Sequence, residues 1–385
     1  MRMALTPEQE ALQAELREYF ARLVVDVEAE ASDESTYTRY IRRMGADGWL
    51  GLGWPREYGG QARGPVDQMI FVEESNWAGV PLPLLTLGSV APTLMALGTD
   101  EQKRDLLPKI LGGKLHFAIG YTEPNAGTDL ASLQTRAVRD GDEYVVDGQK
   151  IFTSAIQHAD YVWLAVRTDP DAPKHKGLSV VLVPTDTPGF HWTPLHTMAG
   201  EFTSATFYEG VRVPVTNLVG EENQGWRLIT NQLNHERVAL CPASGTLRSV
   251  HEVRRWAQDT RLADGRRVMD QAWVRLTLAR VAARAEFLKL MNWKVAWGAD
   301  KGLSPADASA TKVFGTELAL EAYRLLMEIV GPEAYLEEGT PGAVLTARLE
   351  RNYRAHTIFT FGGGTNEIQR DIIAMIGLGM PRAPR

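Results

Sequence analysis

The sequence has very little cysteine, with one residue, Cys241, in 385. A single cysteine excludes a disulfide within the chain, and with it the small folds that depend on disulfide frameworks. The eight histidines are scattered and show no spacing typical of metal ligands, so we expect no metal site. We interpret Cys241 as a small buried apolar residue rather than as a nucleophile.

Long apolar segments and an excess of positive charge are also missing. No run of about 18 apolar residues occurs and the N-terminus carries no apolar signal segment, so we expect no membrane span and a cytoplasmic protein. The net charge is −7, from 41 Lys and Arg against 48 Asp and Glu, which argues mildly against nucleic acid as a partner. No G-x-G-x-x-G follows a strand-like run and no regular β-α-β alternation occurs, which argues against a doubly wound dinucleotide-binding fold.

The sequence divides into three segments that differ in their secondary-structure pattern. Residues 1–116 have helical periodicity, residues 117–225 contain short β-rich runs separated by turn residues, and residues 226–385 return to long helical patterns. The sequence therefore predicts a multi-domain α+β fold. It would have an N-terminal helical domain, a middle β domain of barrel-like or sandwich type, and a C-terminal four-helix bundle.

The expected helices have recognisable starts and lengths. The first begins at Thr6-Pro7-Glu8-Gln9, where Thr is a good N-cap and Gln closes a capping box. The further ranges are Thr36–Asp47, Val66–Trp77, Leu84–Leu97, Thr99–Leu111, Trp226–Trp256, Asp270–Trp297, Pro305–Val330, Gly342–Phe359 and Asn366–Met375. Four large apolar residues of the last segment are interpreted as bundle core. They are Trp273, Met291, Trp293 and Trp297.

The stretch Gly120–Asp129, GYTEPNAGTD, is a polar loop between helical and strand-like sequence. The hydroxyls of Thr122 and Thr128 and the flexible Gly127 lie within a few residues of each other. Hydroxyls and free backbone N–H groups on a glycine-containing loop suit a flat polar ring system or a phosphate. An ordinary polar turn is the alternative, and the stretch alone does not decide between the two.

A series of short motifs resembles those of the acyl-CoA dehydrogenase family. They are GWPREYGG at 53–60, YTEPNAGTD at 121–129, GQKIFTS at 148–154, Ala159-Asp160 before a strand, NHER at 234–237 and GTNEIQR at 364–370. Each motif is weak alone, but their order and spacing over nearly the whole chain are specific. The resemblance implies a helical domain, a β domain and a four-helix bundle, which agrees with the pattern described above.

The resemblance also implies a reaction and a cofactor. Members of this family bind FAD non-covalently and oxidise the Cα–Cβ bond of an acyl-CoA thioester. A carboxylate removes the α-proton, the β-hydrogen leaves as hydride to flavin N5, and the electrons usually pass to an electron-transferring flavoprotein. Because the α-proton is weakly acidic, the carboxylate needs a pKa raised by burial, and donors must face the carbonyl oxygen.

The family places its catalytic base at one of two positions. One directly precedes the C-terminal Gly-Thr, and here it is Gly363, which has no side chain. The other lies on the first bundle helix before an Arg, and here it is Glu236, before Arg237. We therefore predict Glu236 as the base and expect Gly363 to offer its backbone N–H to the thioester oxygen. The alternative for Glu236 is an ordinary helical Glu beside an Arg.

The remaining site positions also follow from the resemblance. The flavin ring and ribityl chain would meet Ile119, Tyr121, Thr122, Gly127, Thr128, Phe152 and Ser154, and the adenosine half would meet Thr365 and Glu367. CoA and the acyl group would meet Asn234, Arg237, Phe361 and Gly362. Phe152 stands in the place of the family's usual Trp, and the alternative is that it belongs to the β-domain core. Thr365 also suits the N-cap of the last helix.

Some positions depart from the family pattern. The Arg-x-x-Phe-Gly motif that clamps the FAD pyrophosphate of a neighbouring subunit is absent from Arg255–Arg267. Glu328 stands where the family has Gln, and Pro332 interrupts the glycine-rich motif that follows. The pattern resembles the actinobacterial enzymes for steroid side-chain CoA thioesters, which are heterotetramers with half the usual FAD. We hypothesise a heterotetramer whose second acyl-CoA dehydrogenase-like chain supplies the clamp, with a homotetramer as the alternative.

Two other functions remain open at this point. The chain could be a non-catalytic structural partner subunit, although a scaffold needs neither the flavin loop nor Glu236. It could also be a flavin oxidase or monooxygenase of the same fold. The acyl group is undetermined, and a base at 236 suits a branched or steroid side-chain acyl-CoA in lipid β-oxidation only by analogy.

Overall fold

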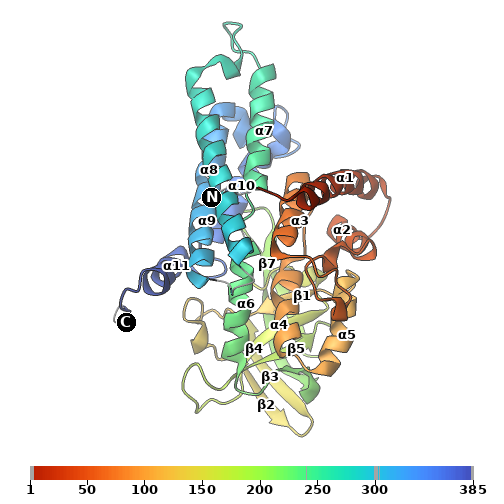
Figure 1. Ribbon diagram of the computed structural model, residues 1–385. Helices are drawn as coiled ribbons and strands as arrows, with labels where there is room; N and C mark the ends of the chain where they lie inside the picture. Colours follow the sequence, from red (N-terminus) through yellow and green to blue (C-terminus); the bar gives the residue numbers. More distant parts are fainter. Residues whose placement is uncertain (1–3, 240, 299–301, 303, 383–385) are drawn as a thin grey trace.

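The computed structural model describes residues 4–239, 241–298, 302 and 304–382. It contains a helical N-terminal part, a middle sheet and a helical C-terminal part, in the predicted order. In Figure 1 the tall part of the molecule is formed by the long helices α7 (Ser244–Asp259), α8 (Ala272–Gly298) and α9 (Pro305–Val330), and the sheet lies at the opposite end.

The N-terminal helices begin as their sequences predict. In the first helix the Thr6 hydroxyl accepts the Gln9 N–H at 3.3 Å, and the Gln9 side chain accepts the Thr6 N–H at 3.1 Å. The helices are α1 (Pro7–Ala29), α2 (Thr36–Ala46), α3 (Pro65–Ala78), α4 (Ala91–Leu97) and α5 (Asp100–Leu111), and the π-helical turn η3 (Thr86–Val90) precedes α4. The range expected as one helix, Leu84–Leu97, therefore contains a π-helical turn, a feature found often at functional sites.

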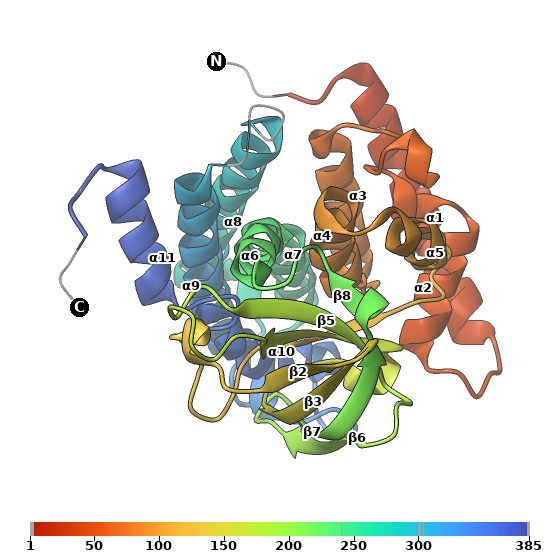
Figure 2. The ribbon, with the colours of Figure 1, turned by 90° about the horizontal axis from the view of Figure 1, so that it is seen from below.

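The middle domain is one mixed sheet of eight strands. Its strands are β1 (Phe117–Gly120), β2 (Arg136–Asp140), β3 (Glu143–Lys150), β4 (Tyr161–Arg167), β5 (Leu178–Pro184), β6 (Phe190–His196), β7 (Phe202–Pro214) and β8 (Leu218–Val219). They are ordered β6-β7-β3-β2-β4-β5-β8, and β1 pairs with β4 in parallel. One face of β4 and β5 packs against α4, α5 and the next helix, α6 (Gly225–Ala239), whereas the other face packs against β3 and β7. Figure 2 shows α6 lying over β5.

The C-terminal part is a bundle with one short side helix. Its helices are α6 (Gly225–Ala239), α7 (Ser244–Asp259), α8 (Ala272–Gly298), α9 (Pro305–Val330), α10 (Arg348–His356) and α11 (Asn366–Ile372). Helices α7, α8 and α9 contact one another, and α6 connects this bundle to the sheet because it packs on both α9 and β5. Both Figure 1 and Figure 2 show α11 on the outer side of the bundle.

Two helices predicted from periodicity are shorter than expected. The range Trp226–Trp256 is divided into α6 and α7. Pro242 has no backbone N–H to donate, and the N–H groups of the next two residues donate to a carboxylate on α3 instead of to the preceding turn. The range Gly342–Phe359 contains only the α-helix α10, because Leu345, Thr346 and Ala347 have φ of 52–53°, outside the right-handed helical region.

The interpretation of the Trp residues as bundle core is wrong for two of them. Trp273 is 46% exposed and Trp297 is 67% exposed. Helix α8 turns another face inward, with Val274, Leu278, Val281, Ala285, Leu288 and Val295 buried. Trp273 and Trp297 fall outside this 3.6-residue periodicity, so the helix leaves them on its outer side.

Candidate functional site

The loop that follows β1 is organised around a buried ion pair. Lys150 ends β3, is 1% exposed, and donates its Nζ to Glu123 Oε1 at 2.8 Å and to the main-chain oxygen of Tyr121 at 3.1 Å. The Glu123 carboxylate also accepts the backbone N–H groups of Gln134 at 2.7 Å and Thr135 at 2.8 Å. The start of the loop is therefore fixed from inside the sheet.

Burial and charge act against each other in this pair. Burial tends to raise the pKa of Glu123, but the Lys150 ammonium and the donors of Thr135 outweigh it, so the pKa of this carboxyl lies below its usual value. Burial lowers the pKa of Lys150 to about 8, and the Glu123 carboxylate opposes that shift. Both groups are therefore charged at pH 7, and the pair holds the loop under ordinary conditions.

The outer side of the loop is polar and open. Thr122 is half-buried, Gly127 and Thr128 are exposed, and within the described ranges neither threonine hydroxyl has a hydrogen-bond partner. A Cβ placed on Gly127 would meet only the Thr122 methyl group, at 4.0 Å. The N–H of Ile151 donates to the main-chain oxygen of Thr122 at 2.8 Å, so the segment after β3 lies directly beside the loop.

That neighbouring segment has two residues in the left-handed region. Phe152 has φ of 62° and Ala155 has φ of 61°, a conformation that costs free energy for residues with a Cβ and that clusters at functional sites. Phe152 is 60% exposed, so the alternative that it is β-domain core is wrong. Ser154 Oγ lies 3.1 Å from Thr203 Oγ1. A large aromatic side chain is thus presented at the surface beside the polar loop.

The glycine turn at 362–364 is fixed by a second buried lysine. Lys312, on α9, is fully buried and donates to the main-chain oxygen of Gly364 and to Asn366 Oδ1, both at 2.8 Å. Gly363 has φ of 67° and Gly364 has φ of 96°, where any L side chain is strained. Position 363 therefore offers a backbone group in a turn whose shape favours glycine.

The chain that follows α6 approaches the same part of α9. Cys241 Sγ lies 3.8 Å from the main-chain oxygen of Lys312, and a Cβ on Gly315 would come within 2.6 Å of Cys241 Cβ. Cys241 is buried, and burial raises the pKa of its thiol to about 12. The expectation of a buried apolar cysteine is confirmed, and α9 connects the end of the α6 segment to the glycine turn.

The predicted base and CoA contacts fall on α6. Asn234, Glu236 and Arg237 lie in the last two turns of that helix, whose backbone is helical to Ala239. Their side chains lie outside the described part of the structure, so their roles stay predictions. The structure does place their helix between α9, η3 and β5.

The positions predicted for the adenosine half and the acyl group lie around the start of α11. The Thr365 hydroxyl accepts the Ile368 N–H at 3.3 Å, which confirms its suitability as an N-cap. Glu367 is exposed, and the backbone donors at the helix start hold its pKa below the usual value, with the Thr365 hydroxyl adding to the effect. Phe361 is 58% exposed. Among the described residues, no hydrogen bond or ion pair joins this segment to the loop after β1.

Sequence reasoning missed the residues that hold these segments in place. Lys150 shares the inward face of β3 with Tyr144 and Val146, at even spacing, so strand periodicity could have marked it as buried. Lys312 shares an inward stripe of α9 with Ala308 and Ala319. A lysine on an inward apolar face requires a partner, but the partners themselves come from distant segments.

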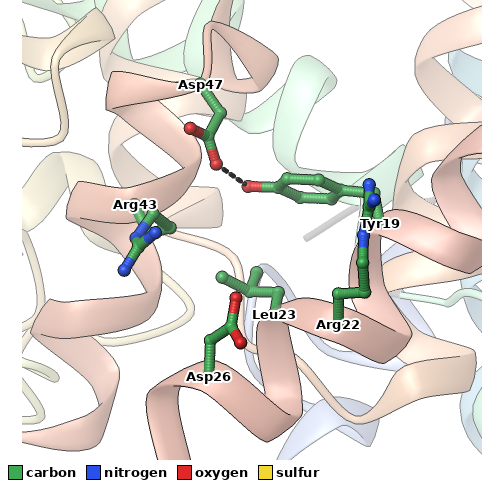
Figure 3. Close-up of a pocket in the computed structure, with 6 residues that line it drawn as sticks. All are labelled: Tyr19, Arg22, Leu23, Asp26, Arg43 and Asp47. Atoms are coloured by element: carbon green, nitrogen blue, oxygen red, sulfur yellow. Dashed lines mark hydrogen bonds between the residues drawn. The ribbon is translucent and has the colours of Figure 1, made fainter. Parts of the chain in front are cut away.

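Two surface hollows lie away from these residues. One of about 260 Å³ lies between α1 and α2, and Tyr19 Oη donates there to Asp47 Oδ2 at 2.9 Å. It is lined by Tyr19, Arg22, Leu23, Asp26, Arg43 and Asp47 (Figure 3). The other, of about 350 Å³, lies between α1, α3, α7 and α8. Neither hollow includes a predicted site residue.

The described ranges also bear on a metal site and on a membrane span. There, no three or more His, Cys, Asp or Glu residues are grouped so that they could hold a metal ion. In the same ranges, no helix has the length and apolar character needed to cross a membrane.

Comparisons with known proteins place the chain among close relatives. Protein-family models described as the N-terminal, middle and C-terminal domains of acyl-CoA dehydrogenase match residues 6–114, 118–211 and 223–378. Acyl-CoA dehydrogenase FadE26 of Mycobacterium tuberculosis is 60% identical, with 100% of both chains covered. Acyl-CoA dehydrogenase FadE29 of the same organism is 51% identical, with 99% of both covered.

Solved structures show the same similarity. A chain of the ChsE4-ChsE5 complex from Mycobacterium tuberculosis superposes with a TM-score of 0.94 at 61% identity, with 100% of both chains covered. A chain of the Tcur3481-Tcur3483 steroid ACAD superposes with a TM-score of 0.93 at 48% identity, again with 100% of both chains covered.

Proposed function

This chain belongs to the acyl-CoA dehydrogenase family, and from that membership we propose that it carries the catalytic base for FAD-dependent α,β-dehydrogenation of a branched or steroid side-chain acyl-CoA. The observation that carries the proposal is the turn at Gly363. Its left-handed backbone disfavours a side-chain base at that position. We therefore assign the carboxylate to the other family position, Glu236.

The residues around the loop after β1 fit FAD. Two threonine hydroxyls without protein partners in the described ranges lie on this loop. The main chain of the loop is bonded to Ile151, and the next residue, Phe152, is an exposed aromatic residue in a left-handed conformation. We assign the flavin ring and ribityl chain to Ile119, Tyr121, Thr122, Gly127, Thr128, Phe152 and Ser154. FAD, when bound, accepts the β-hydrogen of the substrate together with its electron pair.

The chain's own groups perform the proton chemistry in this proposal. Glu236 removes the α-proton, and the electron pair of the broken Cα–H bond forms the new Cα=Cβ bond as the β-hydrogen departs. The Gly363 N–H faces the thioester oxygen, where negative charge develops. Arg237 holds a phosphate or carbonyl of CoA by a charge-assisted hydrogen bond, and Asn234, Phe361 and Gly362 complete the substrate contacts. Thr365 and Glu367 are assigned to the adenosine half of FAD.

A heteromeric assembly is supported by features of the chain. In the segments where the family carries its pyrophosphate clamp, Glu328 is paired with Arg324, and Arg266 is paired with Asp264. Helix α8 also leaves a row of large apolar side chains exposed, and exposed apolar surface commonly marks an interface. They are Trp273, Leu276, Phe287, Leu290 and Trp297.

We infer a second acyl-CoA dehydrogenase-like chain as partner. The two similar solved structures are described as a ChsE4-ChsE5 complex and as a Tcur3481-Tcur3483 steroid ACAD, which supports both the partner and a steroid side-chain substrate here. A homotetramer is the competing assembly. An electron-transferring flavoprotein in the cytoplasm is the proposed electron acceptor.

The assignment of the base is tested with Glu236→Gln in the complex purified with its partner. The variant should bind acyl-CoA but bleach the flavin at least about 100-fold more slowly than wild type on anaerobic mixing, because an amide cannot accept the α-proton. Glu221→Gln, an exposed change just before α6, should bleach as wild type does. Normal bleaching by Glu236→Gln would refute the assignment.

The same experiment separates the alternative functions. A wild-type complex in which no acyl-CoA bleaches the flavin, across short, branched and steroid thioesters, would favour the structural-subunit alternative. Rapid reoxidation of the reduced flavin by air would favour an oxidase or monooxygenase.

A further inference from the structure

We propose that Tyr121 and Gln232 are positioning residues, which set the base-carrying helix α6 relative to the flavin loop. This inference rests on the proposed function, since its consequence is the placement of Glu236 against the bound substrate. Neither residue is expected to touch the reacting atoms through its side chain.

The first observation is a buried chain of hydrogen bonds. Trp163 Nε1, on β4, donates to Tyr121 Oη at 3.0 Å, and Tyr121 Oη in turn donates to Gln232 Oε1 on α6. Trp163 and Gln232 are 0% exposed and Tyr121 is 8% exposed. The sheet, the loop and the helix are therefore joined through one phenol group that is shielded from water, where such bonds are strong and directional.

The second observation is that Tyr121 is held at both of its ends. Its main-chain oxygen accepts the Lys150 ammonium at 3.1 Å, and the same ammonium binds Glu123 at 2.8 Å. The hydroxyl end is held by Trp163. A side chain fixed at the backbone and at the tip cannot follow a movement of α6, so it constrains the helix.

The third observation concerns the position of Gln232 on α6. Position 236 follows it by one helical turn and lies on the same side of the helix. Helix α6 ends at Ala239 and does not continue into α7, so the two helices do not form one rigid body. The hydrogen bond at Gln232, one turn before position 236, can then fix the position of the base along the helix axis and its rotation about that axis.

The chemistry of Gln232 argues against a role in packing alone. Its Nε2 is buried and has no hydrogen-bond partner among the described residues. An unpaired buried N–H₂ group is costly, and a leucine of similar size would avoid that cost. We therefore attribute the presence of an amide at position 232 to its oxygen, which accepts the hydrogen bond from the Tyr121 hydroxyl.

The test uses Tyr121→Phe in the FAD-loaded complex with its partner chain. The change removes only the hydroxyl, so flavin reduction by acyl-CoA should slow about tenfold while the Kd for acyl-CoA changes less than about twofold. Amide hydrogen exchange in Gly225–Ala239 should become about tenfold faster, because the helix loses its anchor. A drop in rate with no change in exchange would overturn the proposal.

Tyr208→Phe is the matched control. Tyr208, on β7, is also buried, but its hydroxyl lies 3.2 Å from Thr206 Oγ1 on its own strand. Both readouts should stay at wild-type values in this variant. An equal effect of the two substitutions would mean that the loss is general to the β domain, and the proposal would fall.

A second variant keeps the test decisive if Tyr121→Phe does not fold. Gln232→Leu should give a similar slowing and faster exchange, and the double variant should be no slower than Tyr121→Phe alone, because both changes break the bond between Tyr121 and Gln232. Additive effects would refute the coupling. If the wild-type complex is not reduced by any acyl-CoA, the proposed function fails, but the exchange measurements still test the link between loop and helix.

Discussion

At Lys150, one ammonium group joins two parts of the loop after β1. It binds the Glu123 carboxylate and the Tyr121 carbonyl, and it is 1% exposed. Desolvating these charges is costly, and removing one partner of a buried pair costs more than the pair contributes net, because the other charge is left unpaired. The pair is best understood as a device that fixes the loop in one conformation rather than as a source of stability.

This pair makes the loop sensitive to acid. The pKa of Glu123 in the folded protein lies below its usual value, so the unfolded chain binds more protons as the pH falls. The stability that the charged carboxylate contributes is present above its unfolded pKa of about 4.3 and is lost as the pH falls through the lower folded value.

Glu123→Gln tests this consequence. The variant should lose about 3 kcal/mol of unfolding free energy at pH 7, and its difference from wild type should shrink below about pH 4, as measured by urea unfolding. The control is Glu143→Gln, because Glu143 pairs with Arg212 at the surface, and it should change stability by less than about 0.5 kcal/mol at each pH. A Glu123→Gln difference that does not vary with pH would contradict the linkage.

At the scale of elements, the interruption between α6 and α7 is the main departure from a regular bundle. Glu73 on α3 is 7% exposed, and its carboxylate accepts the N–H groups of Ala243 at 3.0 Å and Ser244 at 2.8 Å. Asn292 on α8 donates to the main-chain oxygen of Cys241 at 2.9 Å. Side chains from two other helices thus satisfy the backbone groups that the interruption exposes.

Glu73→Gln should destabilise the protein by about 1–2 kcal/mol, since an amide keeps one acceptor but removes the negative charge at the start of α7. Urea unfolding at pH 7 measures this change. Glu286→Gln is a matched control, because Glu286 is exposed at the rim of the hollow that Glu73 also lines, and its stability should stay within about 0.5 kcal/mol of wild type. Equal stability of the two variants would argue against Glu73 as the cap.

At the scale of the whole molecule, the chain has exposed surfaces that suit an assembly. Large apolar side chains lie exposed along α8, and Phe152 and Phe361 lie exposed at the predicted cofactor and substrate segments. Exposed apolar surface of this extent commonly marks an interface. The positions predicted for the two halves of FAD also lie on different segments, with no hydrogen bond between them in the described part of the chain.

The content of bound flavin should therefore depend on the partner. Purified alone, the chain should retain little FAD, because the family's pyrophosphate clamp is missing from Arg255–Arg267. Co-expressed with a second acyl-CoA dehydrogenase-like chain, it should hold about one FAD for each pair of chains, measured by absorbance against protein concentration. One FAD per chain in a stable homotetramer would contradict the proposed heteromeric assembly.

The sequence alone determined the features that depend on near neighbours. The capping box at Thr6, the bounds of α9 and the order of helical, β and helical segments were all predicted correctly. Caps and periodicity act within a turn or two of the chain, so they can be read locally. The series of motifs added the family, although the roles of individual site residues remain predictions.

Only the tertiary structure decided which distant groups meet. The range Trp226–Trp256 has a helical pattern throughout, yet it divides where Glu73, some 170 residues earlier, supplies the acceptor. Gln232 meets Tyr121 from 111 residues away, and Trp273 is exposed because α8 turns another face inward. A buried polar group must find a partner, but local sequence does not specify which segment provides it, because the fold brings that partner from far along the chain.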